Sequence, residues 1–321
     1  MFRRTYVLIG STVTTSVAHG RRATLLRRAK LLRRATLLRR AAFTLIEVLV
    51  VVGMIGLLLA ILLPSLSAAR AQARVVACRS NIRQITAANG LYADEHGGTY
   101  CPGASDFLSN LHRWHGTRSV VSEAFDSARG PLASFLGVDG SIRQCPSFPA
   151  DEVAKESGGF ERGNGGYGYN NAYVGVQLVS ASPFAGVSPS AGESPSAGAK
   201  SRGQVVATDR RGVRRHHIKT PAETLMFADT AFATDGLIEY SFAEPRFHPQ
   251  YPTSRAAPSI HFRHGVGLRK SGQANVGWCD GHVDGREMTF SYASPFYRAK
   301  PERFGIGWFG TSDDNRFFDL R

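Results

Sequence analysis

The stretch that decides the fold runs from Phe43 to Pro64 and reads FTLIEVLVVVGMIGLLLAILLP. The 21 residues from Phe43 to Leu63 would form roughly 32 Å of helix at about 1.5 Å per residue, enough to cross a bilayer core of about 30 Å. Glu47 is the only ionisable side chain in this run. Because a carboxylate in hydrocarbon is costly, such a residue is functional by default. The alternative is a signal anchor that happens to contain one glutamate.

The helical pattern continues beyond the apolar run. Pro64 is expected to kink the helix rather than end it, because helical spacing resumes after it. The sequence HGG, from His96 to Gly98, is expected to stop the helix near Asp94. The apolar positions that predict an amphipathic second half are Leu66, Ala69, Ala73 and Val76, followed with a shifted phase by Cys78, Ile82, Ile85 and Tyr92.

The positive charge of the chain is concentrated before the apolar run. The net charge is +14, and residues 1–42 contribute eleven Lys or Arg and no acidic residue, so the remainder carries +3. The chain therefore lacks the basic surface of a nucleic-acid-binding protein. Residues 21–42 repeat RRATLL with a period of six, which leaves no apolar stripe on a helix. A basic N-terminal segment keeps that end in the cytoplasm, although a low-complexity extension or a wrongly assigned start remains an alternative.

The segment AFTLIEVLVVVGMIGLLLAILLP resembles the N-terminus of type IV prepilins and type II secretion pseudopilins. The resemblance implies that a prepilin peptidase cuts between Ala42 and Phe43, and that the Phe43 amine is then methylated. It also implies that Glu47 neutralises that amine, in the same or a neighbouring subunit, during assembly. The family usually has Gly before the cut, and Ala42 keeps a small side chain there. The implied location is the bacterial inner membrane, with one span, a cytoplasmic N-terminus and an extracytoplasmic head.

Composition changes after residue 95 to short apolar runs separated by Gly, Pro, Asn and Asp, which predicts an α+β fold with an antiparallel sheet. The Ser, Pro, Ala and Gly-rich stretch 180–201 is expected to be a flexible insert, and residues 210–219 a solvated basic loop. The expected strands are Gln204–Thr208, Thr224–Ala228, Leu237–Phe242, Asn275–Cys279 and His282–Met288.

The head also resembles a prepilin-type processing-associated C-terminal domain of large pseudopilin-like proteins. The segments that carry this resemblance are ACRSNIRQITAANGLYADEHGGTYCP, RQCPSFP, GYGYNNAYVG and TPAETLMFADT. The signature of that domain is a His followed about nine residues later by Asp-Gly, which here is His264 and Asp280-Gly281 with fifteen residues between them. The extra residues indicate an insertion at GLRKSG.

Asp280-Gly281 has the composition of a two-residue type I′ hairpin turn, which His264 is expected to help fix. Three other interpretations are open. The pairs His261/His264 and Cys279/His282 have a spacing that a zinc site could use. Asp280 and Asp284 could supply oxygen ligands to calcium. Cys279/His282 or His264/Asp280 could form a nucleophile and base, but no oxyanion or phosphate-binding motif accompanies them.

Four cysteines, at 78, 101, 145 and 279, would lie in a compartment where disulfides persist. A bridge from Cys78 to Cys101 or Cys145 would attach the long helix to the head, and free buried cysteines are the alternative.

The sequence thus predicts a leader over 1–42, a membrane span over 43–63, an amphipathic helix over 64–94 and a head over 95–321. The expected function is that of a structural pseudopilin without enzymatic activity or cofactor. Its partners would be the prepilin peptidase, other pseudopilin subunits and the membrane. The alternative is a membrane-anchored binding protein that recognises a ligand or metal and never polymerises.

Overall fold

The computed structural model describes residues 44–106, 109–137, 140–149, 161–180, 205–208, 211–234, 236–249, 251–265, 272–293 and 300–321. Ala42, Phe43, the basic leader and the SPSAG-containing segment 181–200 therefore lie outside the described residues. The described residues fall into two units, one that ends at Gly56 and one that runs from Leu57 to Arg321.

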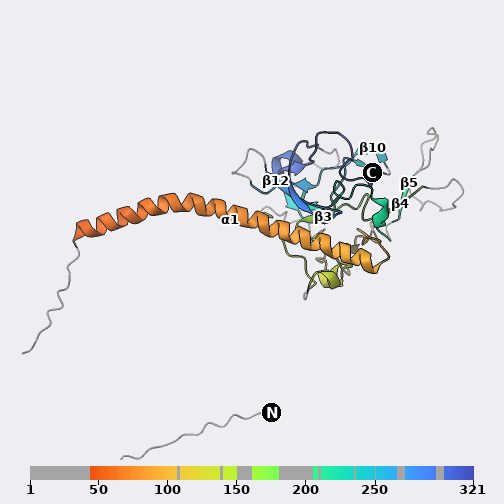
Figure 1. The fold of residues 1–321 in the computed structure, drawn as a ribbon, viewed down its shortest axis with the longest axis horizontal. Coiled ribbons are helices and arrows are strands. Elements are labelled where there is room, and N and C mark those ends of the chain that lie inside the picture. The colour runs from red at the N-terminus through yellow and green to blue at the C-terminus, as the bar shows by residue number, and fades with distance from the viewer. Residues whose placement is uncertain are drawn as a thin grey trace, which may run out of the picture. The chain divides into compact units, whose positions relative to one another are not determined.

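A single helix, α1, runs from Leu45 to Glu95 and crosses the boundary between these units (Figure 1). It continues through Pro64 without interruption, as the spacing predicted. His96 and Gly98 then donate backbone hydrogen bonds back to the last turn, and Gly97 and Gly98 adopt positive φ, so the helix ends where the HGG motif predicted. Every residue from Thr44 to Ser67 is exposed, and α1 is the one described helix long and apolar enough to cross a membrane.

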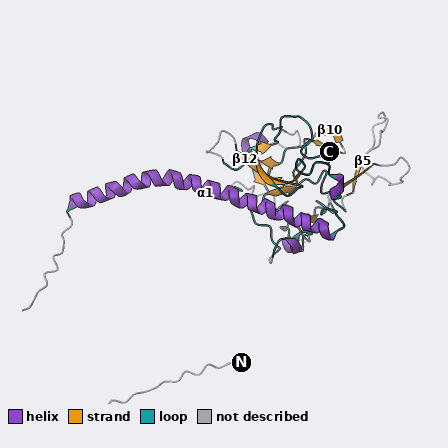
Figure 2. Ribbon diagram, in the orientation of Figure 1, coloured by secondary structure: helices purple, strands orange, loops and turns teal. Residues whose placement is uncertain are grey.

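The remainder of the described chain consists of short strands, 3-10 turns and many loops (Figure 2). The strands are β1 (His112–Arg113), β2 (Gly116–Thr117), β3 (Tyr167–Tyr169), β4 (Gln177–Ser180), β5 (Val205–Thr208), β6 (Leu225–Asp229), β7 (Phe232–Ala233), β8 (Leu237–Ile238), β9 (Phe247–His248), β10 (Tyr251–Arg255), β11 (Ile260–His261), β12 (Gln273–Trp278), β13 (Val283–Glu287) and β14 (Ile306–Gly307). The 3-10 turns are η1 (Ser127–Arg129), η2 (Ala133–Phe135), η4 (Arg215–His217) and η5 (Pro301–Phe304).

The central sheet has the order β13-β12-β6-β3, and all of its neighbours are antiparallel. The fold is therefore α+β, as the sequence predicted. Four of the expected strands correspond to β5, β6, β12 and β13 within two residues at each end. The fifth, Leu237–Phe242, is shortened to β8 because the antiparallel pairing with β7 ends at Ile238; of the following residues, Ser241 and Phe242 are buried.

The second half of α1 packs directly on one face of this sheet. The buried helix positions are Val75, Cys78, Ile82, Ile85, Thr86, Ala88, Asn89 and Ala93, which follow helical spacing. A glycine in β12 permits the close approach, since a Cβ at Gly277 would lie 2.5 Å from Thr86 Oγ1 and 2.7 Å from Ile82 Cγ2. Burial of Cys78, Ile82 and Ile85 agrees with the predicted stripe.

The earlier part of the predicted stripe is wrong, since Leu66 and Val76 are exposed and Val75 is buried in place of Val76. The reason is that contact with the head begins only near Val75, so the preceding apolar positions have no protein surface to cover.

Successive side chains of β12 point to opposite faces of the sheet, and a hydrophobic cluster lies on each face. Asn275 and Gly277 face α1, where Asn275 Oδ1 accepts a hydrogen bond of 2.9 Å from Arg79 Nε. Ala274, Val276 and Trp278 lie in the second cluster together with Trp308 and Phe318. Each face of the sheet is thus covered, one by the helix and one by the C-terminal segments.

Three polar contacts tie the helix to the head, two of them to strand β3. Asn81 Nδ2 donates to Tyr167 Oη at 2.9 Å, and Asn89 Nδ2 donates to Tyr169 Oη at 3.0 Å. The Asn89 side-chain oxygen accepts from Cys101 N at 2.9 Å. These contacts fix the rotation of α1, because apolar packing alone tolerates small rotations whereas paired amides do not.

Candidate functional site

The first turn of α1 contains a capping box built by Thr44 and Glu47. Thr44 N and Thr44 Oγ1 both donate to Glu47 Oε2 at 2.8 Å, and Glu47 N donates to Thr44 Oγ1 at 3.2 Å. This reciprocal arrangement satisfies backbone donors that a helix N-terminus otherwise leaves unpaired. A carboxylate in the first turn also interacts favourably with the helix dipole.

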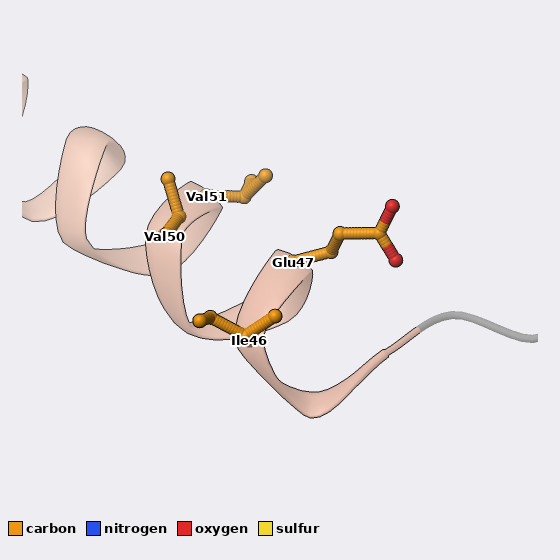
Figure 3. Close-up of a pocket in the computed structure, with 4 residues that line it drawn as sticks. All are labelled: Ile46, Glu47, Val50 and Val51. Carbon is orange, nitrogen blue, oxygen red and sulfur yellow. The ribbon is translucent and has the colours of Figure 1, made fainter.

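The carboxylate of Glu47 nevertheless remains exposed. Figure 3 shows it pointing away from the helix axis, beyond the apolar side chains of Ile46, Val50 and Val51 that line the same shallow site. It can therefore accept a further donor without losing its cap. The spacing T-x-x-E from Thr44 to Glu47 is the sequence signal of a capping box. The prediction made from the sequence treats Glu47 only as a partner of the Phe43 amine and does not use this signal.

The residues of the predicted C-terminal signature lie at opposite ends of one hairpin. His264 N donates to Gln273 O at 2.9 Å and Gln273 N donates to His264 O at 2.7 Å, which extends the open end of the β12–β13 hairpin. Asp280 and Gly281 form the turn at its other end. The expectation that His264 fixes this turn is therefore wrong, since the six residues of β12 separate them.

The turn itself also differs from the two-residue type I′ turn that was predicted. Gly281 N donates to Trp278 O at 2.9 Å and Trp278 N donates to His282 O at 3.0 Å, which leaves a three-residue loop. Gly281 has φ +95°, whereas Asp280 has no positive φ. This is a type I turn followed by a left-handed glycine, which forms a G1 bulge and suits the twist of the strands.

The four residues considered as zinc ligands are not gathered into one cluster. His261 and His264 are buried near β6. Cys279 and His282 lie in the hairpin turn, where the His282 ring stacks on Trp278. The separation follows from the strand geometry, because β12 runs extended between the two pairs.

The acidic groups considered for calcium are engaged within the hairpin. Asp280 Oδ1 lies 2.6 Å from His282 Nδ1, and Asp284 accepts from Trp278 Nε1 at 2.9 Å and pairs with Arg286 at 2.7 Å. For the nucleophile interpretation, burial raises the pKa of the Cys279 thiol, with Asp280 adding to the rise, and this disfavours a thiolate at neutral pH. His264 and Asp280 are kept apart by β12, so they do not form a pair.

His264 instead belongs to a buried ionic cluster around Asp229, at the end of β6. Asp229 Oδ2 lies 2.9 Å from His264 Nε2 and accepts from Asn275 N at 2.7 Å, while Oδ1 accepts from Arg263 Nη2 at 2.7 Å. Burial by itself would raise the pKa of Asp229, but Arg263 and His264 outweigh burial and hold it below its usual value. Asp229 lies in TLMFADT, a segment whose role the sequence did not reveal.

Arg263 connects this cluster to a disulfide. Its Nη2 donates to Gly166 O at 2.6 Å, and its Nε donates to Cys145 Sγ at 3.3 Å. Cys145 is bonded to Cys78 of α1, with the two Cα atoms 5.3 Å apart. The expected staple between helix and head is therefore present, through Cys145, while Cys101 and Cys279 are free thiols.

A second buried polar cluster lies around Glu161. Arg113 Nη2 lies 3.3 Å from Glu161 Oε1, Ser241 Oγ donates to Glu161 Oε2, and His115 Nε2 lies 2.7 Å from Ser241 Oγ. Burial raises the pKa of Glu161 and lowers that of His115 well below its usual value, with Arg113 and Arg118 adding to the latter shift. Ser241 and His115 are both fully enclosed, and the carboxylate contacts the serine rather than the histidine. The arrangement is that of a structural network and not of a hydrolytic triad.

Comparison of the chain with protein-family models, with curated proteins and with solved structures gives no match.

Proposed function

We propose that the chain is a structural pseudopilin subunit of the bacterial inner membrane. In this proposal it is made as a membrane-spanning precursor, cut by a prepilin peptidase between Ala42 and Phe43, and assembled into a pilus-like filament or secretion pseudopilus. The head has no enzymatic role and lies outside the cytoplasm. The resemblance of the Phe43–Pro64 segment to prepilins is one support, and the combination of one long apolar helix with an antiparallel sheet is another.

The observation that carries the proposal is an exposed carboxylate in the first turn of an otherwise apolar, fully exposed helix segment. Residues 44–67 have no protein contact that buries them, so this segment needs either lipid or copies of itself around it. A lipid anchor gains only the helix cap from Glu47, whereas a filament also gains a polar contact that selects and registers its subunits. Contacts that repeat head to tail without closing generate helical filaments.

The experiment that tests processing is mass analysis and N-terminal sequencing of the protein recovered from membranes that contain a prepilin peptidase. The expected mature chain begins at Phe43 and carries a methylated amine. Retention of residues 1–42 in the presence of the peptidase would contradict the proposal.

The test of Glu47 uses three variants, because the capping box gives this residue two roles. Glu47→Ala removes the cap and the charge, Glu47→Gln keeps a capping acceptor without the charge, and Thr44→Ala weakens the cap but keeps the charge. If the carboxylate pairs with the Phe43 amine, filament yield should fall by at least tenfold in both Glu47 variants and by less than twofold in Thr44→Ala.

All three variants should still insert in the membrane, since none of the substitutions makes the Phe43–Leu63 run more polar. A matched control is Glu95→Ala, which removes an exposed carboxylate at the other end of α1. Normal filaments from Glu47→Gln would show that Glu47 serves only as a cap. A chain that stays monomeric in every background would favour the membrane-anchored binding protein instead.

A further inference from the structure

We propose that the Cys78–Cys145 pair, in its reduced dithiol form, is a binding site for a borderline divalent metal ion such as Zn²⁺, with His264 as the third ligand. Cys78 comes from α1, Cys145 from the loop after η2, and His264 from the segment after β11. This inference does not depend on the pseudopilin proposal. It also differs from the zinc set that the sequence suggested, since it shares only His264 with it.

The spacing of the ligand atoms is close to that of a zinc site. The two Sγ atoms and a ring nitrogen of His264 all lie within 4.8 Å of one another. Zinc with Zn–S bonds of about 2.3 Å and Zn–N bonds of about 2.0 Å separates tetrahedral S and N ligands by roughly 3.6 Å. Cys145 Sγ and His264 Nε2 are already 3.7 Å apart. Once the bond between them is broken, the two sulfur atoms have to move to a separation of roughly 3.8 Å, and His264 Nε2 has to leave its 2.9 Å contact with Asp229 Oδ2.

The fold positions these ligands independently of the disulfide. Ile82 and Ile85 hold the adjacent turns of α1 on the sheet, and two backbone hydrogen bonds to Gln273 hold His264. Cys78, Cys145 and His264 are each no more than 2% exposed. A preformed, water-excluding ligand set lowers the ordering cost of metal binding.

The surrounding charges suit a metal ion bound to two thiolates. Zn²⁺ and two thiolates sum to zero, and Asp229 with Arg263 also sums to zero, so the loaded cluster is neutral in a buried site where net charge is costly. Arg263 Nε already donates to Cys145 Sγ, a contact of the kind that stabilises a ligating thiolate. Asp229 Oδ2 lies 2.9 Å from His264 Nε2 but is not among the ligand atoms that lie within 4.8 Å of one another, so Asp229 is a neighbour of the site and not one of its ligands.

The two states of the site are mutually exclusive and balance chemically. A dithiol reductant supplies two electrons and two protons, the Cys78–Cys145 bond breaks, and two thiols form while the reductant becomes its own disulfide. Zn²⁺ then displaces the two thiol protons to solvent as it binds. His264 Nε2 leaves its contact with Asp229 Oδ2 to bind the metal, and the neutral ring keeps its proton on Nδ1. Both the disulfide and the bound metal ion attach α1 to the head. A metal ion would therefore keep this attachment in a chain whose Cys78 and Cys145 have not been oxidised.

The test uses the full chain in detergent micelles, reduced with dithiothreitol, desalted without oxygen and titrated with Zn²⁺ alone. We expect one equivalent of bound zinc by elemental analysis and none in the oxidised protein. Co²⁺ in place of Zn²⁺ should give thiolate-to-cobalt charge-transfer absorption. Bound zinc should also protect Cys78 and Cys145 from alkylation, as mapped by mass spectrometry, while Cys101 and Cys279 react as they do without metal.

Variants assign the ligands. Cys78→Ser with Cys145→Ser should abolish binding, and His264→Asn should weaken it at least tenfold. The control that replaces Cys101 and Cys279 by Ser should retain one equivalent. Reduced wild-type protein that binds no zinc, or protects no cysteine, overturns the proposal whatever the variants do. Unchanged affinity in a folded His264→Asn protein overturns the role of His264.

Discussion

At the scale of single residues, Glu47 and Thr44 show how one side chain can serve two purposes. Within one chain, Glu47 accepts hydrogen bonds from the amide and the hydroxyl of Thr44, which begins the helix. Its carboxylate remains open to a second donor because the whole first turn is exposed. A helix cap of this kind keeps the carboxylate oriented before any partner arrives, which reduces the ordering cost of a later contact.

Gly281 gives the first prediction, because its φ of +95° is a conformation that β-branched residues rarely adopt. Gly281→Val should lower the free energy of unfolding by roughly 2 kcal/mol. The cause would be backbone strain alone, since an added Cβ meets nothing within 4 Å. Asn tolerates left-handed φ, so Gly281→Asn should cost less than half as much. Chemical denaturation of both variants would measure this, and equal losses would show that the turn does not depend on φ.

His115 gives a prediction about pH. Its pKa in the folded chain is lowered, so below about pH 6.5 the unfolded chain binds a proton that the folded chain does not. The wild type should therefore lose stability relative to His115→Gln by about 1.4 kcal/mol for each pH unit below 6.5. Denaturation at several pH values would measure the difference. A stability difference that does not change with pH would contradict the burial of His115 in its neutral form.

At the scale of elements, α1 is one helix with two environments. Its first half is apolar on all sides and exposed, while its second half buries one stripe against β3, β6 and β12. A helix that is apolar all round suits a lipid or fibre interior, and one with a single stripe suits a globular surface. The change occurs near Val75, where contact with the head begins.

Two glycine substitutions test this packing with opposite expected signs. Gly277→Ala should destabilise the head by roughly 1–3 kcal/mol, because its Cβ would overlap Thr86 and Ile82 of α1. Gly90→Ala, within α1, should stabilise it by roughly 0.5–1 kcal/mol, since the nearest atom is 3.4 Å away at the end of the Arg215 side chain. Thermal and chemical unfolding would measure both. A neutral Gly277→Ala would mean that α1 and β12 do not pack as described.

At the scale of the whole molecule, the disulfide links α1 to a loop 67 residues further along the chain. Closing a loop of this length in the unfolded chain corresponds to about 4 kcal/mol on an entropic account. Replacing both Cys78 and Cys145 by Ala should therefore lower the free energy of unfolding by about that amount in oxidising buffer. The free energy of unfolding of the double variant should not change when reductant is added, whereas that of the wild type should fall. Equal sensitivity in both would place the stabilising bridge elsewhere.

The sequence by itself determined the elements whose signals are local. The apolar run, the HGG stop, four of the strands and the α+β class follow from patterns of neighbouring residues, and the structure bears them out. Local patterns also permitted a disulfide between Cys78 and Cys145, but did not favour it over a disulfide between Cys78 and Cys101. They could not locate the start of helix burial, because that depends on where the head comes into contact with α1.

Only the tertiary structure decided which distant residues meet. It placed His264 beside Asp229 and Cys145 rather than beside Asp280, because β12 extends between His264 and the turn while β6 lies next to β12 in the sheet. It also divided the four residues of the suggested zinc set between the two ends of one strand. Spacing along the chain determines which residues a helix or a hairpin brings together. Contacts between neighbouring strands, or between the sheet and a packed helix, depend instead on strand order and burial. The sequence specifies these only through the energy of the whole fold.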